Sequence, residues 1–304
     1  MTHAVTTHNL TFAYNQTNVV HDISLSIANG SIFGFVGPNG AGKSTTIKLL
    51  LGLLTPHSGS VEIYGMDMQR HRTTLLRSIG SLVETPSLYP HLTGEENLEV
   101  VRKIHRVPKN TIAKVLSDVG LASASGKKVK EYSLGMKQRL GIALSLLHSP
   151  RLLILDEPIN GLDPEGILEF RSFLRLLVKE NGVTVLLSSH ILSELEQVVT
   201  DVGIISGGTM KFQGSLSSLQ QMQQRNLILR LSDRVRAEKI IRRHRTAKIS
   251  GADDTISLAV PDKETAASIN RALIEEGIDV YEMMFEQPSL ESVFLNFIQS
   301  EGRK

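Results

Sequence analysis

Residues 31–50 read SIFGFVGPNGAGKSTTIKLL, and this stretch decides the fold of the chain. Its apolar start, residues 32–36, predicts a short strand, and residues 44–53 predict a helix. The turn between them, GPNGAGKS at residues 37–44, fits the pattern G-x-x-x-x-G-K-[ST]. A strand, such a turn and a helix in this order are typical of a loop that binds polyphosphate.

The residue types in this turn suit a dense anion. Glycines such as Gly40 and Gly42 let the backbone turn its N–H groups toward the anion and approach it closely. The unpaired amides at the start of the following helix point at the same charge. The Lys43 ammonium can reach the terminal phosphates, and the Ser44 hydroxyl can ligate Mg²⁺. The turn therefore predicts a polyphosphate site with Mg²⁺.

Composition excludes several other classes of protein. A chain of 304 residues can hold one large domain and a small one. Its formal net charge of +2 gives no argument for a dedicated nucleic-acid binder. The chain has no cysteine, which excludes disulfides and Cys-ligated metals and is compatible with a reducing cytosol. We see no secretory signal and no apolar window of eighteen residues, so any membrane role is expected to come through a partner.

A second chemical cluster follows the apolar run LLIL at residues 152–155. Such a run predicts a strand buried on both faces of a parallel sheet, with its carboxyl end at the edge where these sheets bind ligands. We expect Asp156 to hold Mg²⁺, directly or through water, and Glu157 to orient or deprotonate an attacking water. The alternative is a solvated acidic strand end, and the phosphate-binding turn in the same chain argues against it.

Two further side chains are placed by the strand pattern. The strand predicted at residues 183–187 ends in SSH, which sets His190 at the same edge as Asp156 and Glu157. There it can donate a hydrogen bond to a γ-phosphate and so sense hydrolysis. Tyr14 is the last residue of a strand predicted at residues 4–14, and a turn follows it at residues 15–18. Its ring either stacks on a nucleotide base or only caps the small sheet.

The motifs GPNGAGKST, YSLGMKQR, LLILDEP, NGLD and SSH follow one another in the chain. Together they resemble the ATP-binding cassette of ABC transporters, over about residues 4–220. The resemblance implies an α/β P-loop ATPase with a RecA-like parallel sheet core, an antiparallel β subdomain and a helical signature subdomain. It implies a nucleotide-binding domain over residues 1–224, with ATP and Mg²⁺ as the bound species.

The same resemblance implies roles for individual residues. Asp156 and Glu157 match the Walker B pair, and His190 matches the switch histidine. Tyr14 matches the adenine-stacking aromatic, and Asp163 matches the inter-subunit aspartate. The positions that match the Walker A loop are Gly37, Pro38, Asn39, Gly40, Ala41, Gly42, Lys43, Ser44 and Thr45.

In this family two cassettes pair head to tail, with each ATP between the Walker A loop of one and the signature motif of the other. By this resemblance the amides around Ser133 and Gly135 supply the second half of the γ-phosphate cage. ATP then binds the closed pair better than the open one, and hydrolysis removes that preference. Because this chain has one cassette, we expect a homodimer on membrane-spanning permease subunits at the cytoplasmic face of the membrane, and no nucleic-acid partner.

Two positions depart from the family pattern. The usual L-S-G-G-Q stands here as YSLGM at residues 132–136, and we expect Leu134 and Met136 to pack rather than to bind. The family commonly has Gln where this chain has Glu84, and its amide oxygen there reaches magnesium and the lytic water. A carboxylate keeps the acceptor atoms and adds negative charge beside the other acidic groups. We therefore expect Glu84 to act with Glu157 and His190 in catalysis, and with Ser44 and Asp156 as a metal ligand.

The stretch IGSLVETPSLYPHLTGEENLE at residues 79–99 resembles the branch of ABC proteins that protects bacteria from peptide antibiotics, the lantibiotic-immunity and bacitracin-resistance exporters. The alternatives are an importer, an exporter of drug, lipid or sodium, and a soluble ABC ATPase that acts on ribosomes or DNA. The last class normally has two cassettes or long inserted arms, which are not seen. The cassette does not read its cargo, so the sequence separates the transporters only through Glu84.

Residues 225–304 predict a small C-terminal α+β accessory domain. The pattern indicates a strand, a basic helix, two short strands, a second helix and a strand, which is the order of a split βαβ unit. A closing helix is expected at residues 289–299. The basic run RRHR at residues 242–245 either touches lipid headgroups or a partner, or is a solvated helix face.

Overall fold

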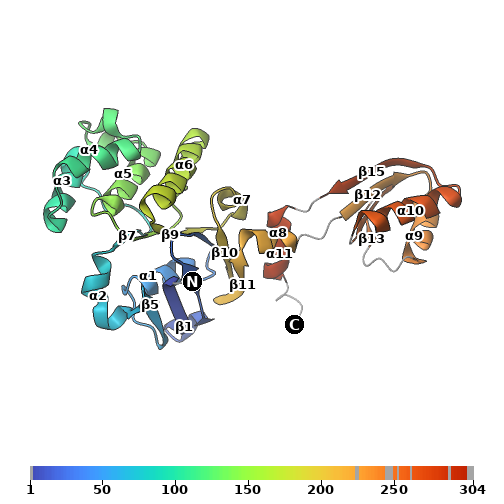
Figure 1. Ribbon diagram of the computed structural model, residues 1–304, viewed down its shortest axis with the longest axis horizontal. Coiled ribbons are helices and arrows are strands. Elements are labelled where there is room, and N and C mark those ends of the chain that lie inside the picture. Colours follow the sequence, from blue (N-terminus) through green and yellow to red (C-terminus); the bar gives the residue numbers. More distant parts are fainter. Residues whose placement is uncertain are drawn as a thin grey trace. The chain divides into compact units, whose positions relative to one another are not determined.

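The computed structural model describes residues 3–222, 226–243, 249–251, 253–260, 262–286 and 289–299. The chain forms two compact units, Met1–Leu216 and Ser217–Lys304. The domain boundary predicted between Gln224 and Arg225 lies outside the described residues and stays a prediction. Figure 1 shows the helices and strands in chain order.

A six-stranded sheet forms the centre of the first unit. Its order is β11-β10-β4-β9-β8-β7; the strands from β10 to β7 are parallel to one another, and β11 is antiparallel to β10. The strands are β4 (Ile32–Val36), β7 (Ile79–Leu82), β8 (Leu152–Leu155), β9 (Thr184–Ser189), β10 (Asp201–Ser206) and β11 (Thr209–Ser215). The residues of β4, β8 and β9 are all buried, as expected for strands covered on both faces. The α/β class predicted from the sequence is confirmed.

An antiparallel sheet is built from the N-terminal part of the same unit. The order is β2-β1-β5-β6, with β3 also paired to β1. The strands are β1 (His3–Tyr14), β2 (Thr17–Ile23), β3 (Ser26–Ala28), β5 (Ser58–Ile63) and β6 (Met66–Asp67). The alternating apolar pattern of residues 19–27 suggests one strand, but the chain breaks between β2 and β3. There the Thr7 hydroxyl donates to the Ile23 carbonyl and accepts from the Leu25 N–H, both at 2.8 Å, in place of ladder hydrogen bonds.

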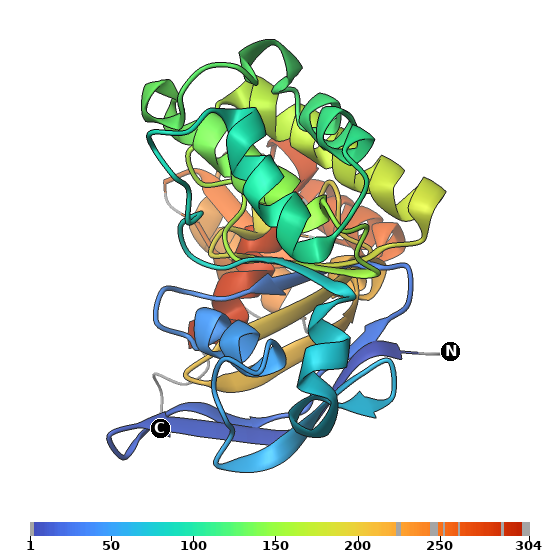
Figure 2. The ribbon, with the colours of Figure 1, turned by 90° about the vertical axis from the view of Figure 1, so that its left-hand side faces the viewer.

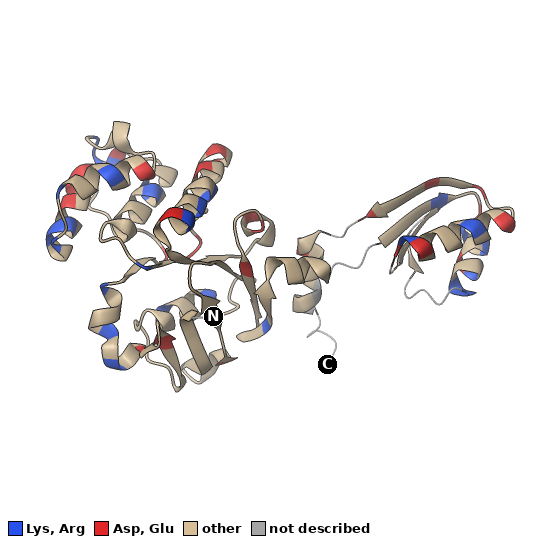
Figure 3. Cartoon of the chain, viewed as in Figure 1, with Lys and Arg blue, Asp and Glu red and all other residues tan. Residues whose placement is uncertain are grey.

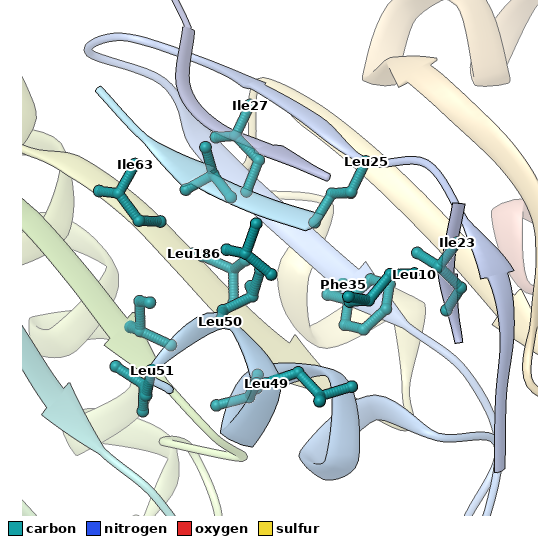
Figure 4. Close-up of a cluster of buried hydrophobic side chains, with 14 of the residues drawn as sticks. Leu10, Ile23, Leu25, Ile27, Phe35, Leu49, Leu50, Leu51, Ile63 and Leu186 are labelled. Carbon is teal, nitrogen blue, oxygen red and sulfur yellow. The ribbon is translucent and has the colours of Figure 1, made fainter. Parts of the chain in front are cut away.

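Helix α1 (Lys43–Leu50) packs between the two sheets. Its Ile47, Leu49 and Leu50 join a buried cluster with side chains of both sheets (Figure 4). Full burial of such a side chain contributes about 1.5–3 kcal/mol, so this cluster fixes the helix firmly. The helix ends three residues before the predicted residue 53. Gly52, at φ +63°, takes the left-handed conformation that terminates many helices.

Helices cover the opposite face of the parallel sheet. Figures 1 and 2 show α3, α4, α5 and α6 on that side, with the antiparallel sheet on the other. The helices of the unit are α2 (Met68–Leu76), α3 (Gly94–His105), α4 (Asn110–Asp118), α5 (Leu134–Leu146), α6 (Pro164–Asn181) and α7 (Leu192–Leu195), with short 3₁₀ turns η1 (Ala122–Ala124) and η2 (Val129–Glu131). Helix α3 begins with a capping box, in which the side chains of Thr93 and Glu96 each accept the other's backbone N–H.

The second unit contains a four-stranded antiparallel sheet with the order β13-β14-β12-β15. Its strands are β12 (Asn226–Leu231), β13 (Ile249–Ser250), β14 (Thr255–Ala259) and β15 (Val280–Glu286), and its helices are α8 (Leu216–Gln221, which begins at the last residue of the first unit), α9 (Arg234–Arg243), α10 (Lys263–Glu275) and α11 (Leu290–Gln299). Apolar side chains of α9 and α10 form one core with those of β12 and β14. The predicted split βαβ order is confirmed. Of the basic run, His244 and Arg245 lie outside the described residues.

No helix in the described part of the chain is both long enough and apolar enough to cross a bilayer.

Candidate active site

The phosphate-binding turn owes its shape to close backbone contacts at two glycines. A Cβ at Gly37 would stand 2.3 Å from the Ile205 carbonyl oxygen, and one at Gly42 would stand 2.7 Å from that of Val19. Gly42 also has φ +104°, which a residue with a side chain rarely adopts. These two positions therefore require glycine for reasons that lie in the fold of this chain as well as in the ligand.

The start of α1 is suited to an anion. Gly42 is the N-cap residue and offers no side chain to the first N–H groups of the helix. Those groups have no acceptor within the helix, so they remain available to phosphate oxygens together with the positive end of the helix dipole. This arrangement fits a polyphosphate at the turn.

The Lys43 ammonium is held over the turn. Its side chain is only 6% exposed, and Nζ donates to the Gly37 carbonyl at 2.7 Å and to the Pro38 carbonyl at 3.3 Å. Nζ also lies 3.3 Å from Glu157 Oε1. The positive charge of the turn and the carboxylate at the end of β8 therefore face each other across the site.

The carboxyl ends of β8 and β9 are joined by a buried hydroxyl. Ser188 Oγ donates to Asp156 Oδ1 at 2.6 Å and accepts the Glu157 N–H at 2.8 Å. Asp156 and Ser188 are both buried. Sequence reasoning missed Ser188, although it stands in the SSH motif. Its partners become visible only when β8 is placed beside β9.

Glu157 lies between a cation and an imidazole. Its Oε2 is 2.9 Å from His190 Nδ1, whereas its contact with Lys43 is made through Oε1. The backbone of Glu157 has φ +49°, an uncommon conformation for a residue with a side chain. A strained backbone that sets a carboxylate between Lys43 and His190 is the kind of arrangement found at reactive centres.

These side chains surround a cavity of about 320 Å³. Its lining consists of Val19, Asn39, Gly40, Gly42, Lys43, Ser44, Thr45, Glu157, Asn160 and His190. Val19 and Asn160 were not predicted. Val19 follows a turn with no motif of its own, and Asn160 belongs to the NGLD motif, in which only the aspartate was assigned.

The oxygen donors at this site suit Mg²⁺. They are the Ser44 hydroxyl at the cavity and the buried Asp156 carboxylate, and hard oxygen ligands of this kind are those that Mg²⁺ prefers. Within the described residues no group of three or more His, Asp or Glu side chains could hold a metal ion by itself. The donors therefore fit an ion that takes its remaining ligands from phosphate and water.

The signature residues lie outside this cavity. Ser133 is the N-cap of α5 and accepts the Met136 N–H at 3.2 Å. Gly135 lies against the turn before α6, where a Cβ would stand 3.1 Å from the Gly161 carbonyl oxygen. Leu134 is 67% exposed, so the expectation that it packs is wrong. It projects from the first turn of α5 beside Gly161, where an added Cβ would stand 2.6 Å from Leu134 Cδ2.

Two other predicted residues also lie outside the lining of the cavity. Asp163 caps α6 by accepting the Gly166 N–H at 3.1 Å, and Arg139 Nη2 lies 4.0 Å from the same oxygen. Tyr14 ends β1 exposed, with its ring edge-on to Phe12 at a centroid distance of 4.8 Å. The sheet-capping and base-stacking interpretations of Tyr14 both remain open.

Glu84 has a partner that the sequence did not indicate. Its Oε1 lies 2.7 Å from Lys48 Nζ of α1, and it does not line the cavity. The hydrogen bond from Lys48 lowers the pKa of the Glu84 carboxyl, and the same bond raises the pKa of Lys48. The extra negative charge expected at this position is therefore countered by a lysine one turn beyond the phosphate-binding turn.

Comparison with known proteins gives consistent matches. The sequence profile of the family described as ABC transporter matches residues 20–160. The bacitracin transport ATP-binding protein BcrA of Bacillus licheniformis is 42% identical over 300 residues, which are 98% of this chain and 98% of that protein. The lantibiotic transport ATP-binding protein SrtF of Streptococcus pyogenes is 45% identical over 200 residues, which are 66% of this chain and 86% of that protein.

A solved structure of the ATP-binding subunit of an ABC transporter superposes with a TM-score of 0.65 and 31% identity, over 72% of this chain and 92% of that one. The superposed part of this chain is about as long as its first unit. The fold of the cassette, predicted from five short motifs, is thus confirmed.

Proposed function

The chain belongs to the family of ABC transporter ATP-binding proteins, and from this premise we propose that it is the ATP-hydrolysing subunit of an exporter that confers resistance to a peptide antibiotic. Members of the family bind ATP with Mg²⁺ and couple its hydrolysis to transport. They work with membrane permeases and pair with a second ATP-binding subunit. We assign the chemical step to residues at the carboxyl ends of β4, β8 and β9, and the pairing to the start of α5.

Glu157 is the general base of the proposed reaction. Its carboxylate accepts a proton from the water that attacks the γ-phosphate, and His190 fixes its orientation through the 2.9 Å contact with Oε2. Lys43 and the first amides of α1 balance the charge of the phosphates. When phosphates draw the Lys43 ammonium toward them, Glu157 loses this ion pair, and its Oε1 is free to face the attacking water.

When bound, Mg²⁺ would supply positive charge that offsets the negative charge of the phosphates. Ser44 and Asp156 are the residues that would hold it, and Ser188 keeps Asp156 in place. Glu84 stays a proposed ligand. Lys48 competes with a metal for this carboxylate, because its Nζ lies 2.7 Å from Glu84 Oε1.

A second copy of the chain completes the site in this proposal. Ser133 and Gly135 lie outside the cavity that contains Lys43 and Glu157, so one copy can contact the phosphates of a bound ATP from one side only. The exposed start of α5, with Ser133 as its N-cap, has the geometry of an anion-binding helix terminus. We therefore propose a head-to-tail pair with two ATP molecules, in which Asp163 lies between the copies. The pair would sit on permease subunits at the cytoplasmic face of the membrane.

The peptide cargo rests on one observation, which is the 42% identity with the bacitracin transport protein over 98% of both chains. That alignment includes the second unit, whereas the alignment with the lantibiotic transport protein covers 66% of this chain. A bacitracin-like peptide is therefore the first candidate. A lantibiotic is the second, because identity over the cassette reaches 45%.

Expression of the chain with its permease subunits in a susceptible bacterium tests this proposal. We expect the minimal inhibitory concentration of bacitracin to rise several-fold, and the rise to vanish in the Glu157→Gln variant. A rise for a lantibiotic alone would select the second candidate. Unchanged sensitivity to both peptides, with normal ATPase activity in the purified complex, would overturn the cargo and point to another exporter substrate.

A further inference from the structure

The segment that carries His190 is tied to helix α6. His190 directly follows β9, and the four-residue helix α7 begins two residues later. Basic side chains lie along α6, and an acidic one lies on α7 (Figure 3). Neither helix contributes to the lining of the cavity that contains Lys43 and Glu157. A contact between these two helices therefore reaches the reaction through His190, which does line that cavity.

Arg171 of α6 makes this contact. Its Nε and Nη2 both donate to the Glu194 carbonyl oxygen, at 3.1 and 2.7 Å. Its Nη1 donates to Gln197 Oε1 at 2.8 Å. A guanidinium presents its donors in a rigid planar fork, so three hydrogen bonds to two residues fix both the position and the direction of α7. Hydrogen bonds from a charged donor are also about twice as strong as neutral ones.

Glu194 connects this contact to the residue that precedes His190. Its Oε2 accepts the Ser189 hydroxyl at 2.8 Å, and the same hydroxyl oxygen accepts the Ile191 N–H at 3.0 Å. The Ser189 residue is only 2% exposed. Serine hydroxyls that bond the backbone two residues ahead fix the turn between them. The backbone of His190 is therefore fixed from both of its neighbours in the chain.

We propose that Arg171 is a positioning residue for His190 and, through it, for Glu157. Arg171 holds the Glu194 carbonyl, and the Glu194 carboxylate holds Ser189. His190 follows Ser189, and its Nδ1 lies 2.9 Å from Glu157 Oε2. This inference rests on the proposed function, in which Glu157 is the general base. It adds that the orientation of the base is set by a residue that does not line the cavity.

The two serines at the end of β9 divide this task. Successive side chains of a strand point to opposite faces of the sheet, so Ser188 and Ser189 serve different partners. Ser188 accepts the backbone N–H of Glu157, whereas Ser189 bonds Glu194. The backbone of Glu157 is thus fixed by Ser188, and its carboxylate is fixed by His190. Loss of Arg171 should loosen the carboxylate and leave the backbone in place.

The Arg171→Met variant should therefore slow turnover without weakening ATP binding. Methionine keeps an apolar stem of similar length and removes every donor. A displacement of about 1 Å at a catalytic group can cost 10²-fold in rate, and we expect kcat to fall about ten-fold. ATP is held in the proposal by Lys43 and the first amides of α1, which are not part of this chain of contacts. KM for ATP and ATP-dependent pairing should therefore stay within two-fold.

Arg175→Met is the matched control. Arg175 lies one turn further along α6, and its hydrogen bond goes to the Gln197 carbonyl rather than to Glu194. The variant loses the same charge from the same helix, so its kcat should stay within two-fold of that of the natural chain. Glu194 provides a second pair. Glu194→Ala should lower kcat as Arg171→Met does, and Glu194→Gln, which keeps an acceptor oxygen for Ser189, should restore most of it.

Hydrogen exchange measures the position of His190 without reference to activity. The Ile191 N–H is bound to the Ser189 hydroxyl, and local opening would expose it to exchange. In the full-length protein we expect Arg171→Met to speed exchange several-fold in a peptide over residues 188–193. Arg175→Met should leave exchange in that peptide unchanged.

Equal kcat in Arg171→Met and in the natural chain would overturn the proposal, as would equal losses in Arg171→Met and Arg175→Met. A parallel loss of ATP binding and pairing in Arg171→Met would also overturn it, because Arg171 would then act on the stability of the whole unit. Normal activity in Glu157→Gln, with faster exchange over residues 188–193 in Arg171→Met, would overturn the proposed base and support the placement of His190 by Arg171.

Discussion

The two units of the chain use their sheets in opposite ways. In the first unit, parallel strands bring Asp156, Ser188 and His190 from distant parts of the sequence to one buried edge. In the second, an all-antiparallel sheet encloses an apolar core, and the ion pair of Arg230 with Asp254 is exposed. Parallel strands create an interior site where chemistry can occur. Among the described residues no polar residue of the second unit is buried as Asp156 and Ser188 are, so we assign the reaction to the first unit.

Replacing Glu157 with Gln should have the largest effect. The amide cannot accept a proton from water, and a general base contributes about 10²- to 10⁴-fold to a rate. We expect steady-state ATPase activity to fall by that factor, while binding of a fluorescent ATP analogue is unchanged. Activity within two-fold of that of the natural chain would show that another residue is the general base.

Ser188→Ala ranks next and tests whether the buried hydroxyl organises the edge. The change removes hydrogen bonds of 2.6 Å to Asp156 and 2.8 Å to Glu157. A buried bond to a charged group contributes about 1.5–3 kcal/mol, so we expect roughly ten-fold lower ATPase activity and a lower melting temperature.

Arg230→Ala is its counterpart in the second unit. An exposed ion pair contributes about 0–1 kcal/mol, so neither ATPase activity nor stability should change much. If the two variants lose activity equally, the division of labour between the units does not hold.

The sequence predicted the fold of the first unit more completely than the contacts within its active site. The turn at residues 37–44 is a local pattern, so its strand, glycines and lysine were all identified. Glu157 and His190 were expected at one edge because parallel strands end on the same side, and the structure places them 2.9 Å apart. Both inferences needed only the order of the elements.

Contacts made by side chains between elements were not predictable. Lys48 reaches Glu84 only because α1 packs beside the loop after β7, and Thr7 interrupts the strand near Leu25 only because β1 passes over it. Leu134 looked like a packing residue by type, yet the start of α5 is exposed. In the second unit the order of elements was predictable, but the exposure of apolar side chains on β15 was not, because exposure depends on how far the helices extend over the sheet.

A moderate effect is expected from the Lys48–Glu84 pair. If Lys48 restrains Glu84 from the metal, then Lys48→Met should lower the Mg²⁺ concentration for half-maximal ATPase activity by a few-fold. Glu84→Gln should leave nucleotide binding intact and alter resistance in cells. The double variant should match Glu84→Gln alone, and strictly additive effects would show that the two residues act independently.

The last prediction concerns acid stability. Burial lowers the pKa of His148 from its ordinary 6.5, and its Nδ1 has no hydrogen-bond partner in the described structure. Because the unfolded chain binds this proton first, the stability that His148 supplies is present above pH 6.5 and is lost as pH falls below it. We expect His148→Gln to reduce the fall in melting temperature between pH 7 and 5. An unchanged pH profile would show that groups other than His148 cause the loss of stability in acid.

Sedimentation of the Glu157→Gln protein with ATP and Mg²⁺ tests the central claim most directly, namely that one copy provides only half of the phosphate site. We predict a dimer with ATP, a weaker association with ADP, and loss of the ATP-dependent dimer when Ser133 is also changed to Arg. A protein that stays monomeric at saturating ATP, alone and with its permease subunits, would contradict the account.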